Sequence, residues 1–115
     1  MPIIKVWCLP NQSEELLRQL HQAIVAAAVS IPELKLKSEQ DMTCLFPPDQ
    51  MQYGLGSEIV IEVTGLFARR NRTPQIKKRL ARKLGEVVKI LYPDSKVECF
   101  VSTFNPRQDG FWSSE

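Results

Sequence analysis

The sequence predicts an α+β fold in which two consecutive β-α-β units form a four-stranded mixed sheet with two helices on one face. Two observations lead to this expectation. Strand-like and helix-like segments follow the order strand, helix, strand, and the same order then repeats. The second set of predicted strands starts about 56 residues after the first. We therefore expect one domain over residues 1–115, with pseudo-repeats at about 2–56 and 57–104 and a C-terminal tail at 105–115.

The first unit begins with a β-branched and apolar run over residues 3–9, which predicts a strand that stops at Pro10. Asn11 is a suitable N-cap for the helix that follows. Apolar residues at helical spacing continue until Ile31, and the proline after it predicts the end of the helix. Residues 41–46 then predict the second strand, which ends at a pair of prolines.

The second unit starts with a strand predicted over residues 58–67. Thr73 is suited to cap the next helix, because Pro74 follows it and proline is favoured at the first helical position. The apolar stripe of this helix ends before Tyr92, where a turn sequence begins. Residues 97–104 predict the last strand.

Both predicted strands at 3–9 and 58–67 are nearly continuous apolar runs rather than alternating ones. Such runs are typical of strands that are covered on both faces of a sheet. The sequence predicts no further helix that could cover the second face. We therefore expect several copies of the chain to pack with their sheets facing inward, as a closed homo-oligomer.

Composition excludes several classes of protein. The chain has 115 residues, 43% of them hydrophobic, and a net charge of only +2, which indicates neither a nucleic-acid nor a membrane partner. No apolar run is long enough to span a membrane, and the N-terminus lacks a secretion signal pattern. Cys8, Cys44 and Cys99 each fall in a predicted strand and indicate reduced, buried thiols in a cytoplasmic protein. With one histidine and no paired cysteines, we expect no metal and no cofactor.

The N-terminus carries the first candidate for chemistry. Met1 is followed by Pro2, and methionine before so small a residue is normally removed, which would leave Pro2 with a free secondary amine. Such an amine can act as a general base where its surroundings lower its pKa towards neutrality. Many proteins begin with the same two residues and use the proline for nothing, so other residues must decide.

The segment from Arg69 to Lys83 contains eight cationic side chains and no acidic one. Nucleic-acid binding is disfavoured, because no aromatic residues lie among them to stack on bases. The cations within the predicted helix indicate a solvated face. Arg69, Arg70 and Arg72 differ, because they lie between a strand end and a helix start, where arginines can bind a carboxylate.

These features together resemble the tautomerase superfamily. The resemblance rests on Pro2 at the start of the first strand, on the motif 48–54, on Thr64-Gly65 and on the arginines before the second helix. It implies a cofactor-independent isomerase, a keto–enol tautomerase of a small keto or enol acid that bears a carboxylate. The chain length is similar to that of the long, fused-repeat members, and this implies a homotrimer.

The resemblance also implies roles for particular residues. Pro2 would be the general base, and Arg69 and Arg72 would bind the substrate carboxylate. Arg70 is an alternative to either arginine, because the loop has one residue more than the corresponding loop of a relative. The amide N–H of Gly65, or of a neighbour, could donate to an oxyanion.

Other positions depart from the family pattern. Lys35 and Lys37 are substitutes, in a shifted loop, for a lysine that relatives carry near the site. Phe100 fits either an apolar wall beside Pro2 or the ordinary core. Glu98, if it faces the pocket, would raise the pKa of the proline and oppose the mechanism, or it would orient a water as in hydrating members.

The C-terminal tail carries two adjacent aromatic residues, Phe111 and Trp112. In long members such a tail contacts a neighbouring subunit, and Arg107 could then contribute to the neighbour's site. Two alternatives to the tautomerase stay open. One is a hydratase or dehalogenase of the same superfamily, and the other is a non-catalytic trimeric binding or regulatory protein whose basic helix is its contact surface.

Overall fold

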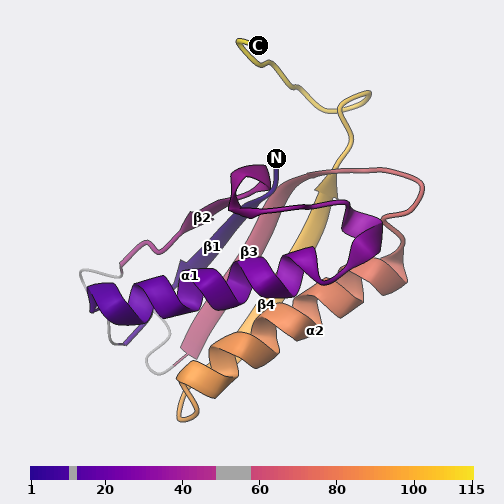
Figure 1. Cartoon of the computed structure of the whole chain (residues 1–115). Helices are drawn as coiled ribbons and strands as arrows, with labels where there is room; N and C mark the ends of the chain where they lie inside the picture. Colours follow the sequence, from indigo (N-terminus) through magenta and orange to yellow (C-terminus); the bar gives the residue numbers. More distant parts are fainter. Residues whose placement is uncertain (11–12, 49–57) are drawn as a thin grey trace.

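A computed structural model describes residues 1–10, 13–48 and 58–115 (Figure 1). Within these residues the chain forms one sheet, with strand order β2-β1-β3-β4, and both α-helices cover the same face of it. The pairs β1–β2 and β3–β4 are parallel, whereas β1–β3 is antiparallel. The mixed sheet expected from the sequence is therefore confirmed. In chain order the elements are β1 (Ile3–Trp7), α1 (Glu14–Val29), η1 (Pro32–Leu34), η2 (Glu39–Asp41), β2 (Thr43–Leu45), β3 (Glu58–Phe67), α2 (Pro74–Leu91) and β4 (Lys96–Phe104).

The first helix is capped by a different residue from the expected one. The hydroxyl of Ser13 accepts a hydrogen bond from the Leu16 amide at 3.1 Å, which satisfies one of the free amides at the helix start. Asn11, which the sequence suggested as the cap, lies outside the described residues, as do residues 49–54 of the family-like motif. The inner face of α1 buries Leu20 and Ile24 completely against the sheet and α2.

The second helix agrees with its sequence signals. The Thr73 hydroxyl accepts a hydrogen bond from the Ile76 amide at 3.3 Å, and Pro74 occupies the first helical position. Leu80 and Leu84 are fully buried, and burial of each leucine side chain stabilises the fold by about 1.5–3 kcal/mol. No helix in the described ranges is both long and apolar enough to cross a membrane.

Two strands are shorter than expected, for local reasons. β1 ends at Trp7 instead of residue 9, because Cys8 takes a left-handed backbone conformation with φ of 67°. β2 begins at Thr43 instead of residue 41, because Asp41 belongs to the 3-10 helix η2. The side chain of Asp41 completes a capping box with Ser38 at the start of that helix, and so the chain cannot yet extend into the sheet.

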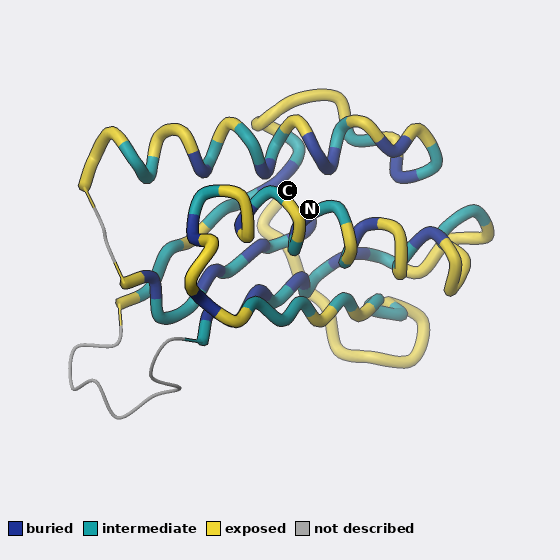
Figure 2. The backbone as a smooth tube through the Cα atoms, turned by 90° about the horizontal axis from the view of Figure 1, so that it is seen from below, coloured by how far each residue is buried: buried dark blue, intermediate teal, exposed yellow. Residues whose placement is uncertain are grey.

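No described helix or loop of the chain covers the second face of the sheet. Burial alternates along β1 and β3, so that only the residues facing the helices are buried (Figure 2). The expectation that both faces are covered is therefore not met by the chain alone. Leu45 and Phe100 are 45% and 59% exposed on this open face, where Glu62 also accepts a hydrogen bond from the Trp7 indole.

The three cysteines are free, but they are half-buried rather than buried. Burial raises the pKa of Cys44 to about 11 and that of Cys99 to about 12, so both thiols are protonated near neutral pH. Cys8 lies just beyond β1 instead of within a strand. The protonated state of Cys44 and Cys99 makes them poor nucleophiles, because the thiolate is the reactive form.

Strand directions bring distant parts of the chain to one end of the sheet. β1 and β2 start there, and β3 and β4 end there (Figure 1). Two hydrogen bonds hold this end together: Thr43 donates its amide to the Pro2 carbonyl at 2.9 Å, and Ala68 donates to the Phe104 carbonyl at 2.7 Å. Residues that precede β1 and β2, or follow β3 and β4, are therefore neighbours.

Candidate active site

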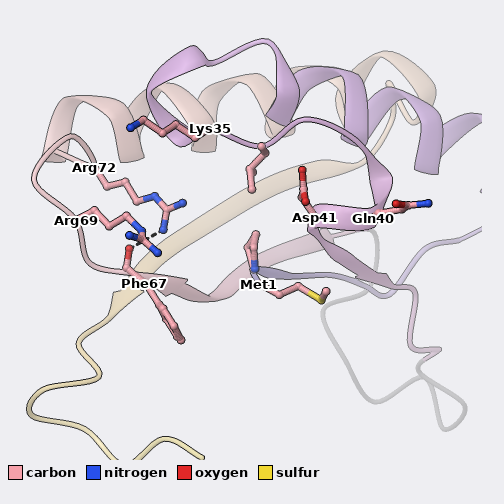
Figure 3. Close-up of a pocket in the computed structure, with 9 residues that line it drawn as sticks. Met1, Lys35, Gln40, Asp41, Phe67, Arg69 and Arg72 are labelled. Carbon is pink, nitrogen blue, oxygen red and sulfur yellow. Dashed lines mark hydrogen bonds between the residues drawn. The ribbon is translucent and has the colours of Figure 1, made fainter. Parts of the chain in front are cut away.

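A cavity of about 250 Å³ opens at this end of the sheet. Its walls come from the N-terminus, the connection between α1 and β2, the end of β3 and the loop before α2. Figure 3 shows Arg69 and Arg72 on one side of the cavity, Asp41 and Gln40 on the other, and Met1 between them. The residues that line it are Met1, Pro2, Lys35, Leu36, Gln40, Asp41, Phe67, Arg69 and Arg72.

Pro2 is buried in the wall of this cavity, next to the first residue of β1. Its carbonyl accepts the Thr43 amide, which fixes it between β1 and β2. In the chain as described, the Pro2 nitrogen is part of the peptide bond to Met1 and therefore cannot accept a proton. Met1 itself is 66% exposed, so its removal would open the Pro2 nitrogen to the cavity without disturbing the core.

Arg72 is tied to the protein backbone by two hydrogen bonds. One terminal nitrogen donates to the Phe67 carbonyl at 2.7 Å and the other to the Leu34 carbonyl at 3.0 Å (Figure 3 draws the contact with Phe67). Its Nε is buried and makes no hydrogen bond to any residue that the structure describes. Burial, with a further contribution from Arg69, lowers the pKa of Arg72 from its usual value. Arg72 thus joins the end of β3 to the last residue of η1, and few of its donors are left for a ligand.

Arg69 and Lys35 are the accessible cations of the cavity. Both residues are exposed, and no hydrogen bond or ion pair within the described residues engages either side-chain head group. Lys35 follows η1 in a left-handed conformation with φ of 57°, where its amide bonds to the Pro32 carbonyl. Of the two lysines suggested by the sequence, Lys35 lines the cavity and Lys37 does not.

Other residues suggested by the sequence lie elsewhere. Arg70 lines a neighbouring cavity instead of this one. Phe100 lies on the open face of the sheet, away from the cavity that holds Pro2. Glu98 is also absent from the cavity and forms an ion pair with Lys96 at 3.6 Å. The structure therefore brings Pro2, Arg69 and Arg72 together, without Phe100 or Glu98.

Gly65 lies beside the N-terminus, but it does not line the cavity. Its φ is +70°, and a Cβ at this position would lie 3.1 Å from the Met1 carbonyl oxygen. We expect Gly65→Ala to lower the free energy of unfolding by about 1–2 kcal/mol, because L-residues with a side chain are strained in this conformation. Urea unfolding of the same chain measures this difference.

Gly85→Ala is the matched control, because this glycine lies within α2 and a Cβ there would meet nothing within 4 Å. It should stabilise the protein by up to about 1 kcal/mol, since alanine favours helix. Equal effects of the two substitutions would show that the backbone at Gly65 is not strained.

Asp41 is the acidic residue of the cavity, and sequence reasoning missed it. Its Oδ2 accepts hydrogen bonds from the amides of Lys37 at 2.7 Å and Ser38 at 3.3 Å, which fixes the carboxylate. No hydrogen bond within the described residues engages Oδ1. The signal was the pattern Ser38-x-x-Asp41, a capping box directly before a strand that starts beside β1. Among the described residues no group of three or more His, Cys, Asp or Glu could hold a metal.

The C-terminal tail contacts its own chain near the cavity. The Phe111 ring packs edge-on against Phe67, with ring centroids 5.0 Å apart, and lies 6.3 Å from Phe104. Phe67 in turn lines the cavity. Trp112 is 83% exposed. Within one chain, Phe111 therefore supports the cavity wall, whereas the expected contact of both aromatics with a second subunit stays a prediction.

The described residues form a doubled β-α-β chain with a cavity beside Pro2, and this cavity is lined by Lys35, Arg69 and Arg72. No protein-family model and no curated protein matches this chain. Solved structures do match it over almost its whole length. A wild-type fused 4-OT, solved as an asymmetric trimer, has a TM-score of 0.75 and 19% identity, over 95% of this chain and 91% of that one.

Two further structures extend the likeness. Malonate semialdehyde decarboxylase, with decarboxylase and hydratase activities, has a TM-score of 0.66 and 12% identity, over 98% of this chain and 92% of that one. Pt0534, solved after inactivation by 2-oxo-3-pentynoate, has a TM-score of 0.70 and 14% identity, over 95% and 91%. At these identities the likeness shows the fold alone, and it agrees with the fold class expected from the sequence.

Proposed function

We propose that this chain is a keto–enol tautomerase, an isomerase of a small keto or enol acid that bears a carboxylate. One observation carries the proposal: buried Pro2 lines the same cavity as Arg69, Arg72 and Lys35, although these residues come from three separate parts of the chain. The similar folds of fused 4-OT and of malonate semialdehyde decarboxylase support an enzyme. The reaction requires that Met1 be removed.

Charge in the cavity suits proton transfer by a free Pro2 amine. Burial and the three nearby cations both disfavour the protonated amine and would lower its pKa, and they outweigh the single carboxylate of the cavity, Asp41, which acts in the opposite direction. Neutral Pro2 would remove a proton from a carbon next to the substrate carbonyl, and the electron pair would move onto the carbonyl oxygen as an enolate. Arg69 would bind the substrate carboxylate, while the fixed charge of Arg72 would stabilise the enolate. Return of the proton at another atom completes the isomerisation without any other reactant.

The open sheet face supports a homotrimer. Its apolar side chains Leu45 and Phe100 are in register with Lys5 and Glu62 on the face away from the helices, and they are 45% and 59% exposed among the described residues. The fused 4-OT structures are trimers. A trimer with the sheets inside would bury this face, and Phe100 would then be an interface residue rather than a wall beside Pro2.

Covalent labelling tests the central claim. Since 2-oxo-3-pentynoate inactivates Pt0534, we expect it to label the Pro2 nitrogen of this protein when Met1 is absent. The amine adds to the alkyne conjugated with the ketone, a C–N bond forms, and a proton moves to the neighbouring carbon. Intact mass should rise by one reagent, and peptide mass spectrometry should locate the adduct at residue 2.

A matched protein with an N-terminal extension that keeps Met1 in place should not be labelled there. Two results would overturn the proposal: retention of Met1 on the protein purified from its native host, or equal labelling of both proteins at other residues. Either result would leave the non-catalytic binding protein as the better explanation. Its suggested contact surface, the basic face of α2, is partly engaged already, because Lys83 donates to the Ser30 hydroxyl at 2.7 Å.

A specific observation favours a second reaction, the addition of water to an unsaturated acid. Asp41 places a fixed carboxylate across the cavity from the arginines, where it could orient a water (Figure 3). The sequence suggested Glu98 for that role, but Glu98 lies outside the cavity. A hydratase would lose its activity on Asp41→Asn and keep the labelling of Pro2, whereas a tautomerase would keep both.

A further inference from the structure

A second cavity, of about 790 Å³, adjoins the one that holds Pro2. Lys35 and Arg69 line both cavities, so the two lie side by side at the end of the sheet. We propose that this second cavity is an anion-binding site for an oxyanion group, a phosphate or a carboxylate. Its polar lining consists of Lys35, Arg69, Arg70, Asn71, Asn105 and Arg107.

The charges of this cavity are all of one sign. Lys35, Arg69, Arg70 and Arg107 line it without a carboxylate, and none of the four forms an ion pair within the described residues. Other exposed arginines of this chain do have acidic partners, such as Glu33 for Arg79 at 3.6 Å and Glu86 for Arg82 at 3.9 Å. Four like charges around one hollow repel one another, and a bound anion would relieve that repulsion.

Backbone contacts fix the two arginines that belong to this cavity alone. The Ala68 amide donates to the Phe104 carbonyl and so joins the loop that carries Arg70 to β4. Within this loop, the Arg72 amide donates to the Arg69 carbonyl and closes a turn. Arg107 lies in a second turn, in which its amide donates to the Asn105 side-chain oxygen at 3.0 Å. Both turns follow parallel strands that end side by side, so they present their arginines to the same space.

The acidic residue of the second turn, Asp109, does not compete for these cations. Asp109 accepts the Asn105 amide at 3.1 Å and donates its own amide to the Asn105 carbonyl at 2.8 Å. It therefore closes the second turn, and it does not line the cavity. The side-chain oxygen of Asn105 is also engaged, which leaves its NH2 group as a donor towards the cavity.

The donor set determines which chemical class fits. Arginine presents parallel N–H groups that match the paired oxygens of carboxylate and phosphate, and the two asparagines add neutral donors. Such a group has two sources. It is either the far end of a substrate whose first carboxylate lies at Arg69, or a separate anion such as phosphate. The proposed anion site does not depend on the proposed reaction. Only the idea that the anion is part of the substrate rests on that reaction.

Titration with inorganic phosphate tests the site without any need for turnover. Calorimetry on the whole chain should show saturable binding, which Arg70→Gln and Arg107→Gln should each weaken roughly tenfold, the loss expected for one charged hydrogen-bonding partner. Lys78→Gln is the matched control, because it removes the same charge from an exposed residue that lines neither cavity. It should change the affinity less than twofold.

Two results would overturn the site: binding that does not saturate, or an equal loss of affinity in the Lys78→Gln protein, which would indicate diffuse attraction to net charge. Both are independent of whether Pro2 is a base. Kinetics then separates the two sources. If the substrate supplies the group, Arg107→Gln should reduce the preference for a keto dicarboxylate over the monocarboxylate of equal length about tenfold. If a separate anion does, phosphate should affect both substrates alike, and Arg107→Gln should raise the phosphate concentration needed for that effect about tenfold.

Discussion

Pro2→Ala should lower kcat/KM for a small enol acid such as phenylenolpyruvate by about a hundred- to ten-thousand-fold, the contribution of a positioned proton-transfer group. The ring of buried Pro2 holds its nitrogen in one orientation directly before β1, and alanine would leave a primary amine that rotates freely. Ultraviolet absorbance follows the conversion of enol to keto acid in both proteins.

The fold should survive this substitution. Loss of the ring methylenes costs about 1–2 kcal/mol of stability, so the unfolding midpoint in urea serves as the control. Activity of the wild type should fall as the pH drops below the pKa of the free amine, because only the deprotonated form is a base. An unchanged kcat/KM in the Pro2→Ala protein would exclude proline catalysis.

Local signals in the sequence sufficed for much of the fold. The expected bounds of β3 match the structure, and α2 begins at Pro74 behind its threonine cap as predicted. The end of β1 was predicted wrongly because one residue there adopts an unusual conformation. Nothing in the apolar run over 3–9 indicates that Cys8 turns left-handed and ends β1 early. Such a conformation depends on the surrounding chain more than on the residue itself.

The candidate site was also only partly predictable from the sequence. Pro2 precedes the first predicted strand, and Arg69 follows the third. These positions alone place both residues at one end of the sheet, because strand direction follows from the β-α-β order. Asp41 could not be found in this way, since residues 41–46 as a whole were expected to be strand. Its place in the cavity depends on η2, a short 3-10 helix stabilised by side-chain hydrogen bonds.

The different tasks of the two arginines were also hidden from the sequence, because the second partner of Arg72 is Leu34, 38 residues away. We therefore expect Arg72→Met to lower the free energy of unfolding by about 2–4 kcal/mol, since it leaves two backbone carbonyls without their charged donor. Arg69→Gln should change stability by less than about 0.5 kcal/mol, because its head group makes no contact that the fold requires.

Arg69, in contrast, should matter for activity rather than for stability. Arg69→Gln should reduce kcat/KM about tenfold or more through loss of the carboxylate partner, while the protein unfolds at the same urea concentration as the wild type. Arg72→Lys keeps the charge but cannot reach both carbonyls as a planar guanidinium does, so it should recover only part of the lost stability. If Arg72→Met were as stable as the wild type, or Arg69→Gln were the destabilised variant, the tasks assigned to the two side chains would be reversed, and Arg72 would be the residue that binds substrate.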